Sequence, residues 1–322
     1  MLERSRRMKA VVLTQPTPAD QVTLTSVPTP KVQPGWVLIK VKAFGLNHSE
    51  KILRLSEIEA DYIQKPIIPG IECVGEIADP SDSQWTRGQR VMALMGGMGR
   101  SFNGSYAEYA LLPVHHVFAV TSSLPWNALA AIPETYFTAW GSLFESLQLT
   151  PDDTLLIRGA TCALGYASIQ LAKALGCRVI ATTHKKEKLP LLQEADQAIV
   201  DSGRLEGSLP MLTKALELVG PQTLYDTMRC TAHGGIVCNT GVLGGLYTVK
   251  AFDPIKFIPN GVYLTGFHSN WPTEHVMHAL FAFISEHRLV PHVGKTFAFS
   301  DIRSALLALD EGRVNGKIVV QI

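Results

Sequence analysis

The hydrophobic positions of this chain follow two patterns, one before and one after about residue 125. In the first part, short apolar runs are separated by Pro and Gly, as at Pro34-Gly35 and Pro69-Gly70. Short strands between turn signals are typical of a compact, mostly antiparallel β-domain. The strands predicted there cover residues 8–13, 37–41, 73–77, 90–94 and 106–110.

From Thr154 onward, continuous apolar runs alternate with helical stretches. The predicted strands are 155–157, 178–182, 198–200, 223–226, 235–238 and 262–265, and the predicted helices are 165–175, 187–194 and 209–219. Continuous apolar strands are buried on both faces, and helical crossovers make them parallel. The pattern therefore predicts a doubly wound dinucleotide-binding sheet.

The end of the chain returns to mixed elements. A helix is predicted over 274–286, followed by a strand over 296–299, a helix over 301–309 and a strand over 317–320. We expect this tail to rejoin the N-terminal β-domain. The prediction is an α/β protein with a β-rich domain over 8–125 and 288–322, and a parallel-sheet domain over 126–287.

The amino-acid composition limits the classes of partner that the chain can bind. The chain has 322 residues, 46% of them hydrophobic and 18% charged, with a formal net charge of +1. This size suits two domains with proper cores, and the balanced charge argues against a nucleic acid partner. No apolar run approaches the roughly 18 residues of a membrane span, so we expect no membrane partner.

The N-terminus and the cysteines predict a cytoplasmic location. Arg4, Arg6 and Arg7 precede only a short apolar run, which does not suit a secretory signal, and we leave residues 1–7 out of the predicted fold. Scattered cysteines without a C-x-x-C motif are typical of reduced thiols and exclude a four-cysteine zinc site. They are Cys73, Cys162, Cys177, Cys230 and Cys238.

A loop of small residues follows the first strand of the parallel sheet. Small residues at such a turn let the backbone approach a pyrophosphate, whose charge is stabilised by the following helix N-terminus. The strict G-x-G-x-x-G string is absent, so a βα loop without a ligand is the alternative. The candidate cofactor residues are Gly159, Thr161, Cys162, Ala163, Leu164 and Gly165.

The end of the second strand normally selects between NADH and NADPH. An acidic residue there binds the ribose 2′-hydroxyl, whereas basic residues accommodate a 2′-phosphate. Here the stretch reads Thr183, His184, Lys185 and Lys186, with no carboxylate at the strand end. This favours NADPH over NADH; a helix start with solvated lysines is the alternative.

Six ordered segments resemble the medium-chain dehydrogenase/reductase superfamily, in particular its zinc-independent quinone oxidoreductase branch. The segments are Asn47-His48-Ser49-Glu50 with Arg54, Ile68-Pro69-Gly70-Ile71-Glu72-Cys73-Val74-Gly75, Gly88-Gln89-Arg90-Val91, Gly104-Ser105-Tyr106-Ala107-Glu108-Tyr109, Phe137-Thr138-Ala139-Trp140 and Gln170-Leu171-Ala172-Lys173-Ala174-Leu175-Gly176. The resemblance implies a GroES-like N-terminal domain and a Rossmann cofactor domain. The sequence departs from the family pattern at Glu50, which replaces the usual Asp, and at Ser56, which replaces the usual Gly. Cys162 and Ala163 also replace the two loop glycines, and each added Cβ crowds the approach to the phosphates.

The resemblance also bears on zinc. Zinc-dependent relatives take their catalytic ligands from a Cys at the position of Asn47, a His at that of Ile71 and commonly a Cys near Glu134. An isoleucine does not bind metal, and a neutral amide is a poor zinc ligand. We therefore expect no metal site; Glu72, Glu134 and His48 are the alternative ligand set.

The remaining site residues are implied by the resemblance. Asn47 is expected near the nicotinamide and the substrate, and His48 and Tyr136 are candidate proton donors, with Tyr62 as the alternative. Further cofactor contacts are expected from Thr138, Thr240, Gly241, Phe267, Ser269 and Lys317. Relatives also pair through the sixth strand of the parallel sheet, which implies a homodimer.

Without zinc, alcohol oxidation lacks the Lewis acid that stabilises an alkoxide, whereas a strong electron acceptor needs less help. We therefore expect an NADPH-dependent oxidoreductase that transfers hydride to a small-molecule quinone or α,β-unsaturated carbonyl. One alternative is an enoyl-thioester reductase. Another is a non-catalytic NADPH-binding protein, which the altered glycine loop would suit.

Overall fold

The computed structural model describes residues 6–322, so residues 1–5, including Arg4, lie outside it. The chain forms two compact units. Unit 1 contains the chain up to Glu134 together with Asn270–Ile322, and unit 2 is Thr135–Ser269. Residues 126–134 and 270–287, predicted within the cofactor domain, thus belong to the β-rich unit. One reason is that α2 (Trp126–Leu129) packs on the central strand and the C-terminal strand of unit 1.

Unit 1 is built on a seven-stranded sheet in the order β14-β15-β3-β4-β5-β7, with β6 also paired to β3. Its central strand, β3, runs over Trp36–Gly45 and alternates buried and more exposed positions in its first half. The other strands are β4 (Glu72–Asp79), β5 (Arg90–Leu94), β6 (Tyr109–Pro113), β7 (Val117–Ala119), β14 (Val293–Ala298) and β15 (Lys317–Gln321). A separate hairpin-like pair joins β1 (Arg7–Val11) to β2 (Leu24–Pro28). The strand predicted over 106–110 begins later, at Tyr109.

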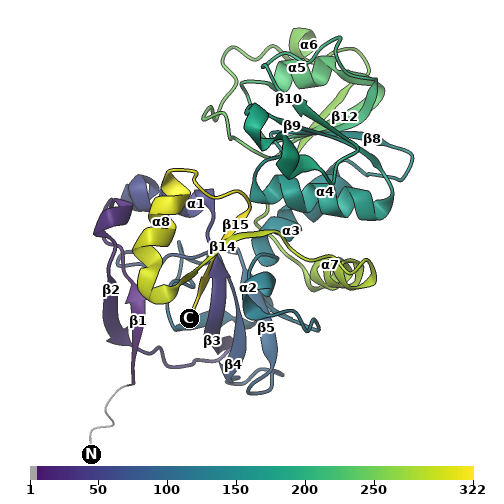
Figure 1. The fold of residues 1–322 in the computed structure, drawn as a ribbon. Helices are drawn as coiled ribbons and strands as arrows, with labels where there is room; N and C mark the ends of the chain where they lie inside the picture. The colour runs from purple at the N-terminus through teal and green to yellow at the C-terminus, as the bar shows by residue number, and fades with distance from the viewer. Residues whose placement is uncertain (1–5) are drawn as a thin grey trace, which may run out of the picture. The chain divides into compact units, whose positions relative to one another are not determined.

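The two ends of the chain meet in unit 1. β15 pairs antiparallel with β3, with Val319 opposite Gly45, so the tail rejoins the N-terminal domain as predicted (Figure 1). The core beneath the sheet includes Phe44, whose ring stacks on Tyr106 at 4.7 Å between centroids. Helices α1 (His48–Leu55), α7 (Glu274–Glu286) and α8 (Ile302–Asp310) complete the unit. This packing places Asn47, Glu72 and Lys317 at adjoining strand and helix ends.

Unit 2 contains a six-stranded, all-parallel sheet in the order β10-β9-β8-β11-β12-β13. In chain order this is 3-2-1-4-5-6, the order of a Rossmann sheet, as predicted. The strands are β8 (Thr154–Arg158), β9 (Arg178–Thr183), β10 (Gln197–Val200), β11 (Leu212–Glu217), β12 (Thr231–Asn239) and β13 (Tyr263–Gly266). Figure 1 shows α4 (Ala163–Leu175) and α5 (Leu224–Arg229) on opposite faces of this sheet.

Two predictions around β11, the fourth strand of the parallel sheet in chain order, are wrong. The helix predicted over 209–219 is wrong because 212–217 forms β11, buried between β8 and β12. The strand predicted over 223–226 is also wrong: the segment begins α5, which buries Leu224, Thr227 and Met228 at helical spacing against β11 and β12. The helix predicted over 187–194 is a 3₁₀ helix over Lys186–Leu192 with a proline inside.

Candidate active site

The cofactor loop of unit 2 is held tightly between β8 and α4. Gly159 has φ +81°, a conformation that glycine adopts without strain. A Cβ on Gly165 would lie 2.1 Å from the Ala160 carbonyl oxygen, so only glycine allows this close packing of helix on loop. The Ala160 N–H donates to the Thr182 carbonyl at 2.8 Å and ties the loop to β9.

Cys162 begins α4 as its N-cap. Its Sγ accepts a hydrogen bond from the Gly165 N–H at 3.3 Å, and burial raises the pKa of the thiol. Ala163 and Leu164 form the first helical turn, with side chains that are neither fully buried nor exposed. The cysteine that replaces a family glycine is therefore neutral and serves the helix start, where an anion is favoured by the helix dipole.

A cavity of about 600 Å³ opens beside this loop, at the carboxyl ends of the central strands. Doubly wound sheets bind dinucleotides at this edge, where the strand order reverses between the first and fourth strands. Of the predicted cofactor residues, Gly159, Thr161, Cys162 and His184 line the cavity. The other lining residues are Thr182, Lys188, Asp201, Ser202, Gly203, Val219, Gln222, Thr223, Leu243 and Gly244. The volume, the helix N-terminus and the glycine turn fit a nicotinamide dinucleotide.

The basic residues after β9 differ in their positions relative to the cavity. Lys185 and Lys186 are exposed and lie outside the cavity lining, whereas Lys188 belongs to it. Thr183 is buried, and its hydroxyl lies 3.2 Å from that of Thr161, which joins the strand end to the cofactor loop. Of these three lysines, Lys188, within the 3₁₀ helix after β9, is the one in the cavity wall.

The sequence analysis did not identify a buried charged group at the carboxyl edge of the parallel sheet. Arg158, the last residue of β8, is fully buried and forms ion pairs with Asp201 and Asp226, both at 2.7 Å. Glu217, at the end of β11, is also buried, and burial raises its pKa. The signal available in the sequence was the arginine itself, because an arginine directly before the glycine turn ends a strand that is otherwise apolar.

A second group in unit 2 joins three predicted residues. The Ser142 hydroxyl donates to the Thr138 carbonyl at 2.7 Å and lies 2.9 Å from the Thr240 hydroxyl. The Phe267 ring covers Gly141, where a Cβ would come within 2.0 Å of the ring. Both Gly141 and Ser142 belong to a π-helical segment over Gly141–Ser146, a distortion frequent at functional sites. Thr138, Thr240 and Phe267 therefore come together.

Gly241 and Ser269 are two further residues that were predicted to contact the cofactor. Gly241 follows β12 and leaves no room for a side chain, because a Cβ would lie 2.2 Å from the Leu218 carbonyl oxygen. The Thr240 and Gly241 N–H groups both donate to the Glu217 carbonyl at 3.1 Å. Ser269 is the last residue of unit 2.

Tyr136 lies in α3 (Pro133–Trp140) and is almost completely buried. Its hydroxyl donates to the Gln170 side-chain oxygen, and burial raises the pKa of the phenol. A phenol held in this way keeps its proton at neutral pH. The proton of this hydroxyl is engaged by Gln170.

Asn47 in unit 1 is part of a buried polar group with Glu72 and Lys317. Lys317 Nζ donates to Asn47 Oδ1 at 2.5 Å and pairs with Glu72 Oε1 at 2.7 Å. Asn47 Nδ2 donates to the same Glu72 oxygen at 2.7 Å. A Cβ on Gly45 would lie 2.3 Å from Lys317 Cε, so this glycine makes room for the ion pair. Lys317, predicted as a cofactor contact, fixes the orientation of the Asn47 amide.

Glu50 lies next to this group. Its carboxylate accepts from the Asn47 N–H at 2.7 Å and from the Ile71 N–H at 2.9 Å. Burial and the neighbouring Glu72 raise the pKa of Glu50 to about 7, against these hydrogen bonds. Glu50 therefore exchanges a proton near neutral pH, a property that its sequence motif does not reveal.

The two other proton-donor candidates of unit 1 are at the surface. His48 is exposed in the first turn of α1, and its pKa is lowered, first by desolvation and then by the charge of Lys51. Tyr62 is 68% exposed and donates to Glu57 Oε1 at 3.0 Å. His48 is therefore mostly neutral at physiological pH.

The residues at the zinc positions of relatives do not fit a zinc ion. The Asn47 amide is engaged by Lys317 and Glu72, and Ile71 has no donor atom. The second Glu72 oxygen accepts from the Glu134 N–H at 2.8 Å. Among residues 6–322, no three His, Cys, Asp or Glu side chains are grouped so that they could hold a metal ion. None of the helices in this range is long and apolar enough to cross a membrane.

Two family models match the chain. The alcohol dehydrogenase GroES-like domain matches residues 33–122, and the zinc-binding dehydrogenase domain matches residues 194–320. The first match lies within the β-rich unit, and the second includes four strands of the parallel sheet, β10 to β13, and most of the C-terminal tail.

Individual relatives agree with these matches. Human quinone oxidoreductase is 29% identical over 233 residues, which cover 68% of this chain and 68% of the relative. The crystal structure of AibC superimposes with a TM-score of 0.89 at 26% identity, covering 99% of this chain and 97% of the other. The Bacillus subtilis protein YhfP, crystallised with NAD bound, superimposes with a TM-score of 0.84 at 24% identity, covering 99% and 100%. The chain thus belongs to the medium-chain dehydrogenase/reductase superfamily, whose members use a pyridine nucleotide, and it fits the quinone oxidoreductase branch.

Proposed function

We propose that this chain is a zinc-independent, NADPH-dependent reductase that transfers hydride to a quinone or an α,β-unsaturated carbonyl compound. The observation that carries the proposal is the cavity at the switch point of the parallel sheet, with Lys188 in its wall and the glycine turn at its base. The relatives named quinone oxidoreductase support the same reaction class.

The choice of NADPH rests on charge at the end of β9. Thr183 ends the strand without a carboxylate, and His184 and Lys188 follow it in the cavity wall. A 2′-phosphate is a dianion that such residues stabilise, whereas the 2′-hydroxyl of NADH needs an acceptor there. In unit 2, the loop backbone and the N-terminus of α4 would hold the pyrophosphate, and Thr138, Thr240 and Phe267 would shape the nicotinamide end.

The proposed class of hydride acceptor follows from the polar groups that unit 1 offers to a substrate. When NADPH is bound, it supplies the hydride, and a quinone or enone accepts that hydride without a metal to polarise it. Asn47 is held by Lys317 and Glu72, so its amide is a fixed polar group beside which a carbonyl oxygen can be oriented. The accompanying proton comes from solvent or is relayed from solvent through His48, which is exposed.

Assembly and location belong to the same proposal. β13 is the edge strand of the parallel sheet, and Tyr263 on it is 63% exposed. Since an edge strand presents unpaired backbone groups, we propose that two copies of the chain pair through β13 in a homodimer. The scattered free cysteines, four of them buried, suit the reducing cytoplasm.

The test is stopped-flow oxidation of NADPH against a panel of quinones, enals, enones and enoyl thioesters. The proposal predicts fast consumption with at least one quinone or enone. Consumption only with enoyl thioesters would replace the substrate class. Tight NADPH binding without consumption by any acceptor would identify a binding protein instead of a reductase.

A further inference from the structure

Arg158 is an unusual residue for its position. It ends β8, directly before the glycine turn of the cofactor loop, and none of its surface is exposed. Its guanidinium makes paired hydrogen bonds to Asp201, with Nε to Oδ2 at 2.7 Å and Nη2 to Oδ1 at 3.0 Å. Such a paired arrangement fixes both the charge and the orientation of a carboxylate.

Asp201 has no acceptor capacity left. Besides the two bonds from Arg158, its Oδ1 accepts from the Gly203 N–H at 2.8 Å, and its Oδ2 faces the Thr182 hydroxyl at 3.5 Å. An ionised carboxylate has about four lone-pair sites. Arg158 also lowers the pKa of Asp201, so the group stays ionised and its charge is balanced by the guanidinium.

Asp201 lies beside the end of β9. Its N–H donates to the carbonyl of Thr183, the last residue of β9, at 2.8 Å. Its side chain lines the same cavity as His184 and Lys188. A carboxylate therefore does stand beside the position that selects between NADH and NADPH, although it comes from the neighbouring strand.

The second acid on Arg158 holds the rest of this cavity wall. Asp226 binds Arg158 Nη1 at 2.7 Å and accepts from the Leu205 N–H at 2.8 Å and the Glu206 N–H at 3.2 Å. Arg158 thus fixes both ends of the loop from Asp201 to Glu206, in which Ser202 and Gly203 line the cavity.

We propose that Arg158 is a specificity-determining residue: by saturating Asp201, it prevents this carboxylate from accepting a ribose 2′-hydroxyl or repelling a 2′-phosphate, so that the cavity takes a 2′-phosphorylated adenine nucleotide. The inference rests on the proposed NADPH site. Freed from the guanidinium, Asp201 would act as the acidic residue that selects NADH. With Asp201 neutralised, the guanidinium would add a positive charge to the site.

The test uses 2′,5′-ADP and 5′-AMP, which differ at the 2′ position, and measures their Kd values by isothermal titration calorimetry on the full chain. Asp201→Asn is expected to raise the preference for 2′,5′-ADP about threefold or more, because the partly released guanidinium attracts the phosphate. Arg158→Gln is expected to lower the preference about tenfold or more, since the carboxylate is then uncompensated. The double variant should regain most of the wild-type preference.

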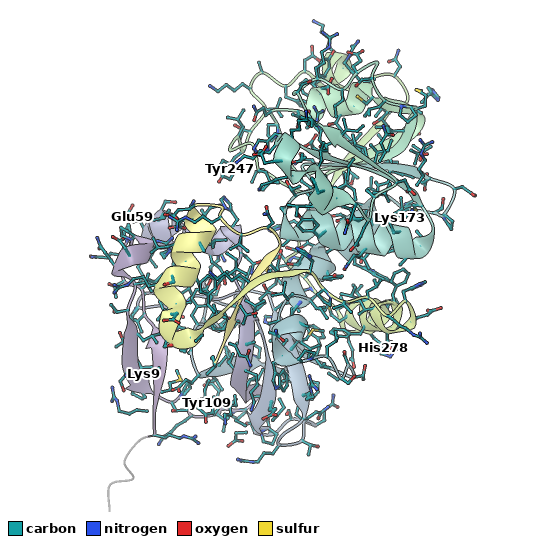
Figure 2. The ribbon with its side chains drawn as sticks, viewed as in Figure 1. Lys9, Glu59, Tyr109, Lys173, Tyr247 and His278 are labelled. Carbon is teal, nitrogen blue, oxygen red and sulfur yellow. The ribbon has the colours of Figure 1, made fainter. Side chains whose placement is uncertain are left out.

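A matched control is Asp196→Asn. Asp196 pairs with Lys173 on α4, labelled in Figure 2, and is not part of the cavity wall. This variant removes one carboxylate from the residue before β10, outside the cavity wall, so its nucleotide preference should equal that of the wild type. A change as large as that of Asp201→Asn would show that the effect is general electrostatics and would overturn the inference.

The outcomes separate the inference from the function it rests on. If the wild type binds 5′-AMP as well as 2′,5′-ADP, the NADPH site itself is wrong. If the wild type prefers 2′,5′-ADP and Asp201→Asn leaves that preference unchanged, the role of Arg158 is wrong. Should Arg158→Gln not fold, Asp201→Asn still decides, because it keeps the arginine and its bond to Asp226.

Discussion

Two buried cations, one in each unit, contact acids in different ways: Arg158 in unit 2 and Lys317 in unit 1. In unit 2, the Arg158 guanidinium serves Asp201 and Asp226 at once, and the pKa of Asp201 is lowered. In unit 1, the Lys317 ammonium binds Glu72 and the Asn47 amide, and nearby Glu50 is held by the backbone N–H groups of Asn47 and Ile71. The pKa of Glu50 is nevertheless raised to about 7.

The difference follows from the two cations. A guanidinium has five donors in a planar fork and does not lose its proton, so it can hold two carboxylates in fixed orientations. An ammonium is a compact charge that pairs best with one acid. Unit 2 therefore has a permanent charge arrangement, suited to recognising a charged cofactor, whereas unit 1 has a carboxyl group that titrates near neutral pH.

The largest expected effect is on stability, from Arg158→Gln. Removing the guanidinium leaves buried acids without a cation, and such a loss typically costs about 3–5 kcal/mol. The free energy of unfolding, measured by urea titration with a probe in unit 2, should fall by this amount. A loss as small as that of an exposed pair, which Asp196→Asn provides, would show that the guanidinium does not balance these acids.

The next effect is the pH dependence that Glu50 introduces. Its pKa is raised from 4.5 to about 7 in the folded protein, so the folded state binds more protons than the unfolded state between these values. Stability from this group is present at low pH and falls as pH rises through about 7. Relative to Glu50→Gln, the wild type should lose about 3 kcal/mol between pH 4.5 and pH 8. Equal slopes for wild type and variant would contradict the placement of the proton on Glu50.

Lys317→Met should give a smaller loss, because Glu72 keeps its bonds from Asn47 and the Glu134 N–H. We expect about 2 kcal/mol from the unpaired carboxylate. The turnover number should fall more than the KM for NADPH rises, since Lys317 acts by orienting Asn47. Lys317→Arg keeps the charge and serves as the control. A change in KM for NADPH alone would instead favour the direct cofactor contact predicted from the sequence.

The smallest effect separates the lysines after β9. Lys188→Ala should weaken NADPH binding about tenfold while leaving NADH within about twofold, because only NADPH carries the 2′-phosphate. Lys185→Ala and Lys186→Ala are matched controls whose exposed side chains lie outside the cavity lining. Fluorescence titration with both nucleotides measures these affinities. A larger effect from either control would return the phosphate site to the two lysines favoured by the sequence.

The parallel sheet was predictable because β8, β9 and β12 contain uninterrupted apolar runs, each next to a turn or helix signal. β11 was misassigned because Lys214 and Glu217 interrupt its apolar residues at a helix-like spacing. Tertiary burial between β8 and β12 decides its conformation, and single-sequence patterns do not contain that information.

Site residues were predictable only where they are contiguous in the sequence. The glycine turn and the residues after β9 are contiguous, so their roles could be inferred from one segment. The charge pairings are not: Arg158 and Asp201 are 43 residues apart, and Asn47 and Lys317 are 270 residues apart. The raised pKa of Glu50 likewise arises from burial and from Glu72, which only the folded chain brings together.

The most direct measurement is the steady-state rate of NADPH oxidation with a quinone, before and after exhaustive treatment with a zinc chelator. The account predicts that kcat/KM is unchanged by chelation and by added zinc, and that NADPH is used at least tenfold better than NADH, as a site for a 2′-phosphate requires. Loss of activity on chelation with recovery on zinc addition, or a preference for NADH, would contradict it.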